Sequence, residues 1–151
     1  MIPAVIRPVA DEHELAAACL LLQRFFREEQ FDTLPETVAA HARRMHELQD
    51  RCLMLVGWAD GQPVAVATLS MDFGIEFGWQ AEIGDLYVAP SVRGQGLATR
   101  LVEECIAWAR GKGARSVAVT VTPHGADQGL DRFYRALDFQ DDGRRLLLRR
   151  V

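Results

Sequence analysis

The sequence lacks an apolar run of the roughly 20 residues that a transmembrane helix needs, and it has no N-terminal signal-peptide pattern. It also lacks a basic excess, since 17 Lys and Arg stand against 21 Asp and Glu. Nucleic acid is therefore a poor partner, because phosphates require a concentrated basic face. Without a transmembrane or signal segment, we expect a cytoplasmic protein that does not contact a membrane. Cysteine is scarce, and we expect Cys19, Cys52 and Cys105 to be reduced thiols.

Two further groups of motifs are missing. The four histidines have neither the spacing of a zinc protease motif nor neighbouring cysteine ligands, so we expect no metal. No Gly-x-Ser-x-Gly occurs, which argues against a serine nucleophile on a strand-to-helix elbow.

The charge is distributed unevenly along the chain. Residues 1–89 hold 14 acids and 6 bases, whereas residues 90–151 hold 7 acids and 11 bases. No Lys or Arg occurs between Arg51 and Arg93. An acidic half joined to a basic half indicates either two small partners of opposite sign or two ordinary solvated surfaces, and the counts leave both open.

A length of 151 residues with 49% apolar and 25% charged residues predicts one α/β domain over residues 1–151. Apolar periodicity, caps and turn residues define its elements. The predicted helices cover Asp11 (N-cap) to about Glu29, Pro35 onward with Thr33 as cap, a segment beyond Pro90 that ends at a left-handed Gly111, and about 127–137. The predicted strands are 5–7, 52–59 and 63–70 around an Asp60-Gly61-Gln62 turn, 79–88, 116–122, and a final pair ending at 144–148.

The most informative segment is a strand and a turn followed by glycines that open an amphipathic helix, Leu86 to Ala98. Glycines let the backbone approach an anion closely, and the N–H groups at the start of a helix favour phosphate. A Walker loop is excluded because no Gly-Lys-Ser/Thr follows. A Rossmann fingerprint fails because Thr99 stands where a third glycine or alanine belongs, and because the next strand ends without an acid.

Arg93-Gly94-Gln95-Gly96-Leu97-Ala98 follows a Leu-x-Val-x-Pro strand, and the late predicted helix carries Phe133-Tyr134 with Phe139 after it. In these two elements the sequence resembles the GNAT superfamily of N-acetyltransferases, whose acetyl-CoA motif is Arg/Gln-x-x-Gly-x-Gly/Ala. The resemblance covers nearly the whole chain. It implies a mixed sheet of about six or seven strands flanked by about four helices, with splayed strands at the acetyl-CoA site.

The resemblance also implies which residues act on acetyl-CoA. The N–H groups from Gly94 to Thr99 would hold the pyrophosphate, and the strand at Leu86–Val88 would bind the pantetheine arm through its backbone. Tyr134 matches the tyrosine that protonates the departing thiolate; the alternative is a buried aromatic residue. The implied acetyl-CoA residues are Leu86, Tyr87, Val88, Arg93, Gly94, Gln95, Gly96, Leu97, Ala98 and Thr99.

Two carboxylates qualify as the general base that deprotonates the amine. Glu82, our first choice, resembles the base of histone-type members, and Asp85 resembles an acidic position of aminoglycoside-modifying members. On an ideal strand they point to opposite faces, unless a bulge intervenes. Either could instead pair with an arginine or cap a turn.

The sequence departs from the family pattern in two places. Pro123–Asp127 occupies the region where members often carry an asparagine that holds the pantetheine arm. Asp138-Phe139 replaces the usual Gly-Phe, and Asp tolerates the left-handed conformation better than most residues do.

The expected acceptor is a cationic amine, first of all an aminoglycoside, whose acetylation would confer antibiotic resistance. Carboxylates interleaved with aromatic rings suit ammonium groups and sugar rings. The alternatives are ordinary solubility charges, a polyamine, a peptide N-terminus or lysine, or a non-catalytic acyl-CoA-binding module. The oligomeric state stays open, because small members of the family often form a homodimer, whereas the arginines of the last strand could equally form a solvated edge. The candidate acceptor-binding residues are Phe26, Glu29, Phe31, Asp32, Asp72, Glu76 and Trp79.

Overall fold

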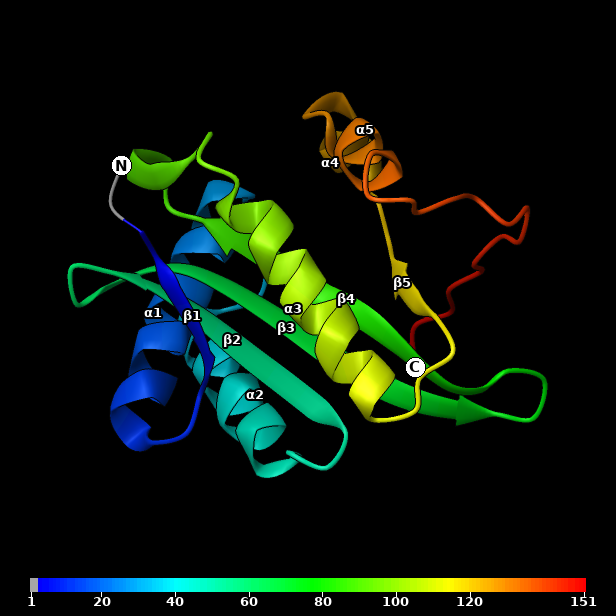
Figure 1. Cartoon of the computed structure of the whole chain (residues 1–151), viewed down its shortest axis with the longest axis horizontal. Coiled ribbons are helices and arrows are strands. Elements are labelled where there is room, and N and C mark those ends of the chain that lie inside the picture. Colours follow the sequence, from blue (N-terminus) through cyan, green and yellow to red (C-terminus); the bar gives the residue numbers. More distant parts are fainter. Residues whose placement is uncertain (1–2) are drawn as a thin grey trace. The chain divides into compact units, whose positions relative to one another are not determined.

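The computed structural model describes residues 3–151, which contain one five-stranded sheet with the order β1-β2-β3-β4-β5 (Figure 1). Neighbouring strands are antiparallel except for β4 and β5, which are parallel. The chain forms two compact units, one ending at Val119 and one comprising residues 120–151. All five strands lie in the first unit: β1 Val5–Pro8, β2 Cys52–Ala59, β3 Gln62–Gly74, β4 Gly78–Val88 and β5 Val117–Val119.

The first unit also contains three long helices and one 3₁₀ turn. They are α1 Glu12–Glu28, α2 Pro35–Glu47, η1 Pro90–Val92 and α3 Leu97–Gly111. The second unit has two short helices, α4 Pro123–Asp127 and α5 Leu130–Arg135. Across residues 3–151, no helix is long and apolar enough to span a membrane.

The predicted start of α1 is confirmed. Asp11 is the N-cap, and its carboxylate accepts a 2.8 Å hydrogen bond from the Glu14 backbone N–H. The Glu14 side chain reaches back to the Ala10 backbone N–H at 2.7 Å, one residue before the usual capping-box partner. These contacts satisfy the Glu14 N–H, which the first turn of the helix leaves unpaired, and the Ala10 N–H just before the cap.

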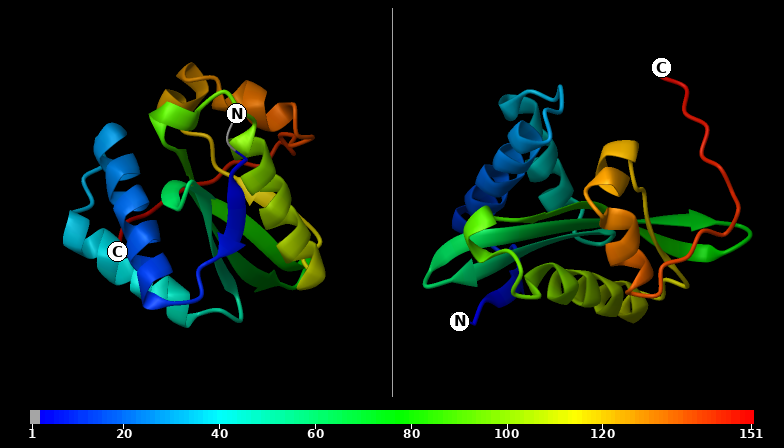
Figure 2. Two further views of the ribbon diagram at one scale, coloured as in Figure 1. Left: turned by 60° about the vertical axis from the view of Figure 1, so that its left-hand side comes forward. Right: turned by 90° about the horizontal axis from the view of Figure 1, so that it is seen from above.

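The sheet of the first unit is covered on both faces (Figure 2). One face packs against α1 and α2, with Met54, Val56, Val66 and Tyr87 in the same buried cluster as residues of these helices. The other face packs against α3, and a Cβ atom placed on Gly57 of β2 would lie 3.7 Å from the Leu97 side chain. We call these the α1/α2 face and the α3 face.

The β2–β3 hairpin is confirmed as a tight turn. Asp60 and Gly61 have φ angles of 50° and 73°, the left-handed conformation of a two-residue type I′ turn. Gln62, which we predicted in the turn, already belongs to β3. Strand β3 also continues to Gly74, beyond the predicted end at Ser70, so the expected irregular stretch shortens to residues 75–77.

The predicted strand number is wrong. Five strands occur where six or seven were expected, because no strand follows Val119 among the described residues. Leu146, Leu147 and Leu148 are 81%, 88% and 79% exposed instead of forming a closing pair. Three consecutive leucines lack the alternation that fixes the register of a half-buried strand, so this segment has little local preference for one pairing.

The helix count differs for a local reason. Five α-helices occur among the described residues instead of about four, because α4 forms before the predicted helix 127–137, which itself shortens to α5. Gly129 adopts φ +85°, which ends helical geometry between α4 and α5. Asp138, in contrast, adopts the predicted left-handed conformation at φ +67°.

Three smaller expectations also need correction. The N-cap of α2 is Leu34 without a side-chain cap, because Pro35 rather than Thr33 fixes this helix start. Gly111 remains helical, and Gly113 takes the left-handed position at φ +90° in a Schellman end, with Ala114 N–H donating to the Ala109 carbonyl at 2.9 Å. Strand β5 has three residues and is only partly covered, not a long strand buried on both faces.

Candidate active site

A β-bulge at Gly84 shapes β4 beside the predicted acetyl-CoA loop. Asp85 lies opposite Thr68 of β3, but Ile83 already lies opposite Leu69, so Gly84 is an extra residue on β4. A Cβ atom on Gly84 would lie only 3.2 Å from the Thr68 hydroxyl oxygen. Glycine therefore fits this position because the neighbouring strand approaches closely.

The bulge brings the two candidate bases onto one face of the sheet. Glu82 pairs with Ser70 and Asp85 pairs with Thr68, and these two partners lie on the same side of β3. Tyr87, opposite Val66, continues the same series and belongs to the α1/α2 face. Glu82 and Asp85 therefore face the same side, as the sequence allowed only if a bulge intervened.

Asp85 is partly buried and has one specific partner. The Thr68 hydroxyl, itself 2% exposed, donates a 2.6 Å hydrogen bond to Asp85 Oδ2. Burial raises the pKa of Asp85 above its ordinary value, and the hydrogen bond from Thr68 opposes this shift. A carboxylate with a raised pKa is a stronger base once it has lost its proton.

Strand β4 continues beyond its parallel neighbour. Strand β5 pairs only with Ala81–Ile83, whereas β4 runs on to Val88 and remains paired with β3 along that length. Among residues 3–119, no strand pairs with the other edge of Gly84–Val88. This edge matches the expected splay, and its backbone groups can pair with an extended ligand arm.

The loop that follows β4 presents backbone N–H groups. Gly94 and Gly96 adopt φ +79° and +78°, and a Cβ atom on either would meet nothing within 4 Å. Among residues 3–151, no backbone carbonyl accepts a hydrogen bond from the N–H groups of residues 94–99. An open glycine loop with unused donors at the start of the 15-residue helix α3 fits a pyrophosphate group.

The Arg93 side chain turns back toward the protein instead of extending along the loop. Its Nε donates to the Val88 carbonyl at 2.8 Å, and its terminal nitrogen donates to Glu28 Oε2 at 2.9 Å. Its guanidinium also lies 5.7 Å from the centre of the Tyr87 ring. Arg93 therefore holds the loop rather than offering a free cation.

Glu28, the last residue of α1, links three parts of the site. Its Oε1 accepts a 2.6 Å hydrogen bond from the Tyr87 hydroxyl, while its Oε2 contacts Arg93. The Tyr87 hydrogen bond, with help from Arg93, lowers the pKa of Glu28 despite partial desolvation. Burial and the adjacent carboxylate raise the pKa of Tyr87 to about 12, so this phenol remains protonated at neutral pH.

Four of the seven predicted acceptor-binding residues lie beside this network. Phe26 and Phe31 form an aromatic cluster with Phe25, whose ring is 5.5 Å from that of Tyr87. Glu29 and Asp32 belong to the same loop between α1 and α2. Tyr87 is two residues from Asp85 on the same face, so the residue that contacts the cluster lies about 7 Å along β4 from Asp85.

The remaining predicted acceptor residues lie at the far end of β4. Asp72, Glu76 and Trp79 surround the β3–β4 turn, and Trp79 precedes Asp85 by six residues, or about 20 Å of strand. Trp79 packs against Phe73 at 5.2 Å, and Asp72 lies 3.9 Å from Arg51. One small amine cannot contact both groups of residues at once.

Tyr134 lies on α5 in the second unit. It is 7% exposed, and its ring packs between Phe133 at 5.0 Å and Phe139 at 5.3 Å. The predicted Phe-Tyr and Phe elements are thus brought together within this unit. The asparagine position of the family is occupied by α4, where Thr122 caps the helix by accepting from the Gly125 N–H at 3.0 Å.

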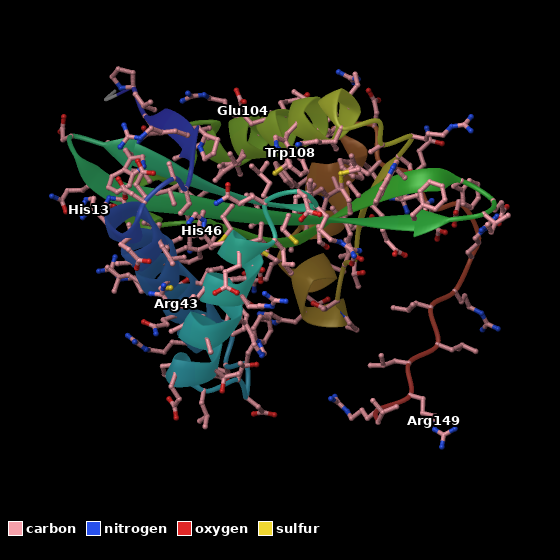
Figure 3. All side chains as sticks on the ribbon, turned by 90° about the horizontal axis from the view of Figure 1, so that it is seen from below. His13, Arg43, His46, Glu104, Trp108 and Arg149 are labelled. Atoms are coloured by element: carbon pink, nitrogen blue, oxygen red, sulfur yellow. The ribbon has the colours of Figure 1, made fainter. Side chains whose placement is uncertain are left out.

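A cavity of about 120 Å³ lies elsewhere in the first unit. It is lined by residues of α2, α3 and the start of β2, among them Cys52 and the His46 and Trp108 side chains that are labelled in Figure 3. None of the predicted site residues lines it. The three cysteines are free thiols, and burial raises the pKa of Cys105 to about 12, which makes it unreactive. The described residues contain no cluster of three or more potential metal ligands.

Sequence reasoning missed three residues of this site. Glu28 was only one of several acids in its loop, and its partner Arg93 is 65 residues away. Thr68 was an ordinary strand residue. An isolated glycine within a strand pattern is a signal for a bulge, so Gly84 could have been found.

Comparison with known proteins places this site in a family. The family model described as acetyltransferase (GNAT) family matches residues 15–139. The aminoglycoside N(6′)-acetyltransferase type 1 of Acinetobacter haemolyticus is 27% identical over 117 residues, 70% of this chain and 76% of that protein. The aminoglycoside N-acetyltransferase AAC(6′)-Iy in complex with CoA has a similar fold, with a TM-score of 0.83, 19% identity, and coverage of 99% of this chain and 96% of that chain.

A second complex of AAC(6′)-Iy, with the bisubstrate analog CoA-S-monomethyl-acetylneamine, gives a TM-score of 0.82 at 20% identity and covers 99% of both chains. The fold and the matched segment together define an acetyltransferase. This chain belongs to the acetyltransferase (GNAT) family, as its motifs predicted. Acetyl-CoA is accordingly its co-substrate, and the residues that hold it remain predictions.

Proposed function

We propose that this protein transfers an acetyl group from acetyl-CoA to a primary amine of a cationic small molecule, with an aminoglycoside as the first candidate. The observation that carries the proposal is the bulge at Gly84, which sets Glu82 and Asp85 on one face of β4 beside the glycine loop. Bound acetyl-CoA supplies a thioester carbonyl that an amine can attack. The residues of this chain then move the protons and hold the reactants.

Asp85 is the general base in this proposal, with Glu82 as the alternative. Asp85 belongs to the stretch of β4 that extends past β5, whereas Glu82 lies opposite Ala118 of β5. Burial also raises the pKa of Asp85, which strengthens it as a base. Asp85, directly or through a water molecule, accepts the proton that the amine loses as its nitrogen bonds to the acetyl carbon.

The backbone of the loop and of β4 holds the co-substrate. The N–H groups of residues 94–99 bind the pyrophosphate, and the open edge of Leu86–Val88 pairs with the pantetheine arm. An N–H group of that edge can polarise the thioester carbonyl. Tyr134, by its position in the family motif, donates its phenol proton to the thiolate as the carbon–sulfur bond breaks.

The acceptor class follows from the residues beside Asp85. Phe26 and Phe31 offer aromatic faces, and Glu29 and Asp32 offer carboxylates in the same loop. This combination suits a molecule that carries several ammonium groups on sugar rings. The curated relative at 27% identity is an aminoglycoside N(6′)-acetyltransferase, which supports the same class. Acetylation of an aminoglycoside would make the protein an antibiotic-resistance enzyme.

A panel of acceptors tests the proposal. Purified protein is incubated with acetyl-CoA and aminoglycosides, polyamines or basic peptides, and free CoA thiol is measured. We expect thiol release with at least one aminoglycoside and greater resistance of a susceptible strain that expresses the gene. Release with polyamines or peptides alone would reject the aminoglycoside assignment. CoA binding without turnover in every acceptor would instead indicate an acyl-CoA-binding module.

A further inference from the structure

We propose that Glu28 is a positioning residue that holds both segments of the acetyl-CoA site in their binding geometry. This inference rests on the proposed function, because it concerns the same loop and strand edge. Glu28 was not among the predicted site residues. It lies at the end of α1, outside both segments, and reaches each of them through one carboxylate oxygen.

One oxygen of Glu28 fixes the end of β4. The Tyr87 hydroxyl donates to Glu28 Oε1 at 2.6 Å. Tyr87 belongs to Leu86–Val88, the stretch of β4 that does not pair with β5. The Tyr87 side chain is 5% exposed and belongs to the core with α1. The hydrogen bond therefore fastens the strand end to α1 without using any backbone group of the open edge.

The other oxygen fixes the loop. Arg93 donates to Glu28 Oε2 at 2.9 Å and to the Val88 carbonyl at 2.8 Å, so its guanidinium connects the first residue of the motif with the last residue of β4. The side chains of Glu28 and Arg93 are 39% and 51% exposed, which allows rearrangement when the partner is lost. The left-handed residues Gly94 and Gly96 follow within three positions, and a Cβ atom on either would meet nothing within 4 Å.

This arrangement predicts the sign of a mutational effect. If Glu28 positions the loop, its neutralisation loosens Arg93 and residues 94–99, and CoA binds more weakly. If Glu28 merely competes with phosphate for Arg93, neutralisation frees the cation and CoA binds more tightly. The same variant thus separates a positioning residue from an inhibitory ion pair.

The test is calorimetric titration of CoA into wild type, Glu28→Gln and Glu28→Ala. We expect the Kd to rise about tenfold for Glu28→Ala and by a smaller factor for Glu28→Gln, because glutamine can still accept from the Tyr87 hydroxyl. Tyr87→Phe should weaken binding as well. Combined with Glu28→Ala, it should cost less than the sum of the two single effects, because each of these two variants removes the same hydrogen bond.

Glu12→Gln is the matched control. Glu12 is at the other end of α1 and forms a comparable exposed ion pair with Arg43, at 2.9 and 3.0 Å. This variant should leave the Kd for CoA unchanged. Thermal unfolding of each variant shows whether the fold is retained. In the two Glu28 variants, the KM for acetyl-CoA should rise by a larger factor than kcat falls.

The outcomes are distinguishable. Unchanged or tighter CoA binding by Glu28→Gln and Glu28→Ala would overturn the role of Glu28 while leaving the proposed function intact. Failure of the wild-type protein to bind CoA would overturn the proposed function itself. An equal loss of affinity in Glu12→Gln would show that α1 stability, not the position of the carboxylate, governs binding.

Discussion

The Thr68 hydroxyl donates a 2.6 Å hydrogen bond to Asp85 Oδ2 across strands β3 and β4. This bond opposes the rise that burial imposes on the pKa of Asp85. Thr68→Val removes the donor and leaves the burial, so the pKa of Asp85 should rise further. We expect the acidic limb of the pH profile of kcat/KM to move to higher pH. Thr37→Val on α2 is the control: it makes the same substitution away from the site and should leave the acidic limb of the pH profile unchanged. An unchanged acidic limb in Thr68→Val would show that Asp85 is not the base.

Asp85→Asn should make the protein more stable at neutral pH but less active. Because its pKa is raised by burial, Asp85 keeps its proton to higher pH in the folded protein than in the unfolded chain. The free energy of unfolding therefore falls as the pH rises from the pKa of Asp85 in the unfolded chain through its higher pKa in the folded protein. This loss of stability persists at neutral pH. Asparagine carries no such charge, so Asp85→Asn should unfold at a higher temperature at pH 7 and show little difference below the ordinary pKa of aspartate.

The same variant should lose most of its kcat in the acetyltransferase assay. Glu82→Gln is the comparison, because Glu82 lies on the same face but outside the open stretch of β4. A large loss of kcat in Glu82→Gln with near-normal turnover in Asp85→Asn would assign the base to Glu82, the first choice from the sequence.

Gly84→Ala tests whether the bulge sets the site. The added Cβ would lie 3.2 Å from the Thr68 hydroxyl oxygen, so Thr68 or β4 must shift, and the hydrogen bond to Asp85 is disturbed. We expect a clear loss of kcat and a stability loss of about 1 kcal/mol, at the low end for an overpacked position. Gly74→Ala, in the same hairpin but with nothing within 4 Å, should change neither quantity much.

The sequence predicted the locally encoded parts of this protein. The cap of α1, the Asp60-Gly61 turn and the glycine loop each depend on residues within a few positions of one another. The relation between Glu82 and Asp85 depends on the register against β3, and the contact of Glu28 with Arg93 depends on tertiary packing over 65 residues. The leucines at 146–148 failed as a strand prediction because pairing requires a partner that local propensity does not specify.

Tyr134→Phe tests the predicted general acid. The ring of Tyr134 is 7% exposed between Phe133 and Phe139, and phenylalanine preserves this packing. We expect kcat to fall at least tenfold while the midpoint of thermal unfolding changes little. A parallel measurement on Tyr87→Phe should show its main effect on the Kd for CoA instead. Normal turnover by Tyr134→Phe would make this residue a packing aromatic.

Gly96→Ala and Gly113→Ala separate backbone strain from ligand binding. Both glycines are left-handed, at φ +78° and +90°, and an added Cβ would meet nothing within 4 Å at either site. Each substitution should therefore cost a similar 1–2 kcal/mol of folding stability, roughly the penalty for an alanine in this conformation. Gly96 precedes α3 within the proposed pyrophosphate loop, whereas Gly113 follows the same helix. Only Gly96→Ala should raise the Kd for CoA, by about tenfold or more, because relief of the strain redirects the N–H groups of residues 94–99. Equal effects of the two variants on CoA binding would place the pyrophosphate elsewhere.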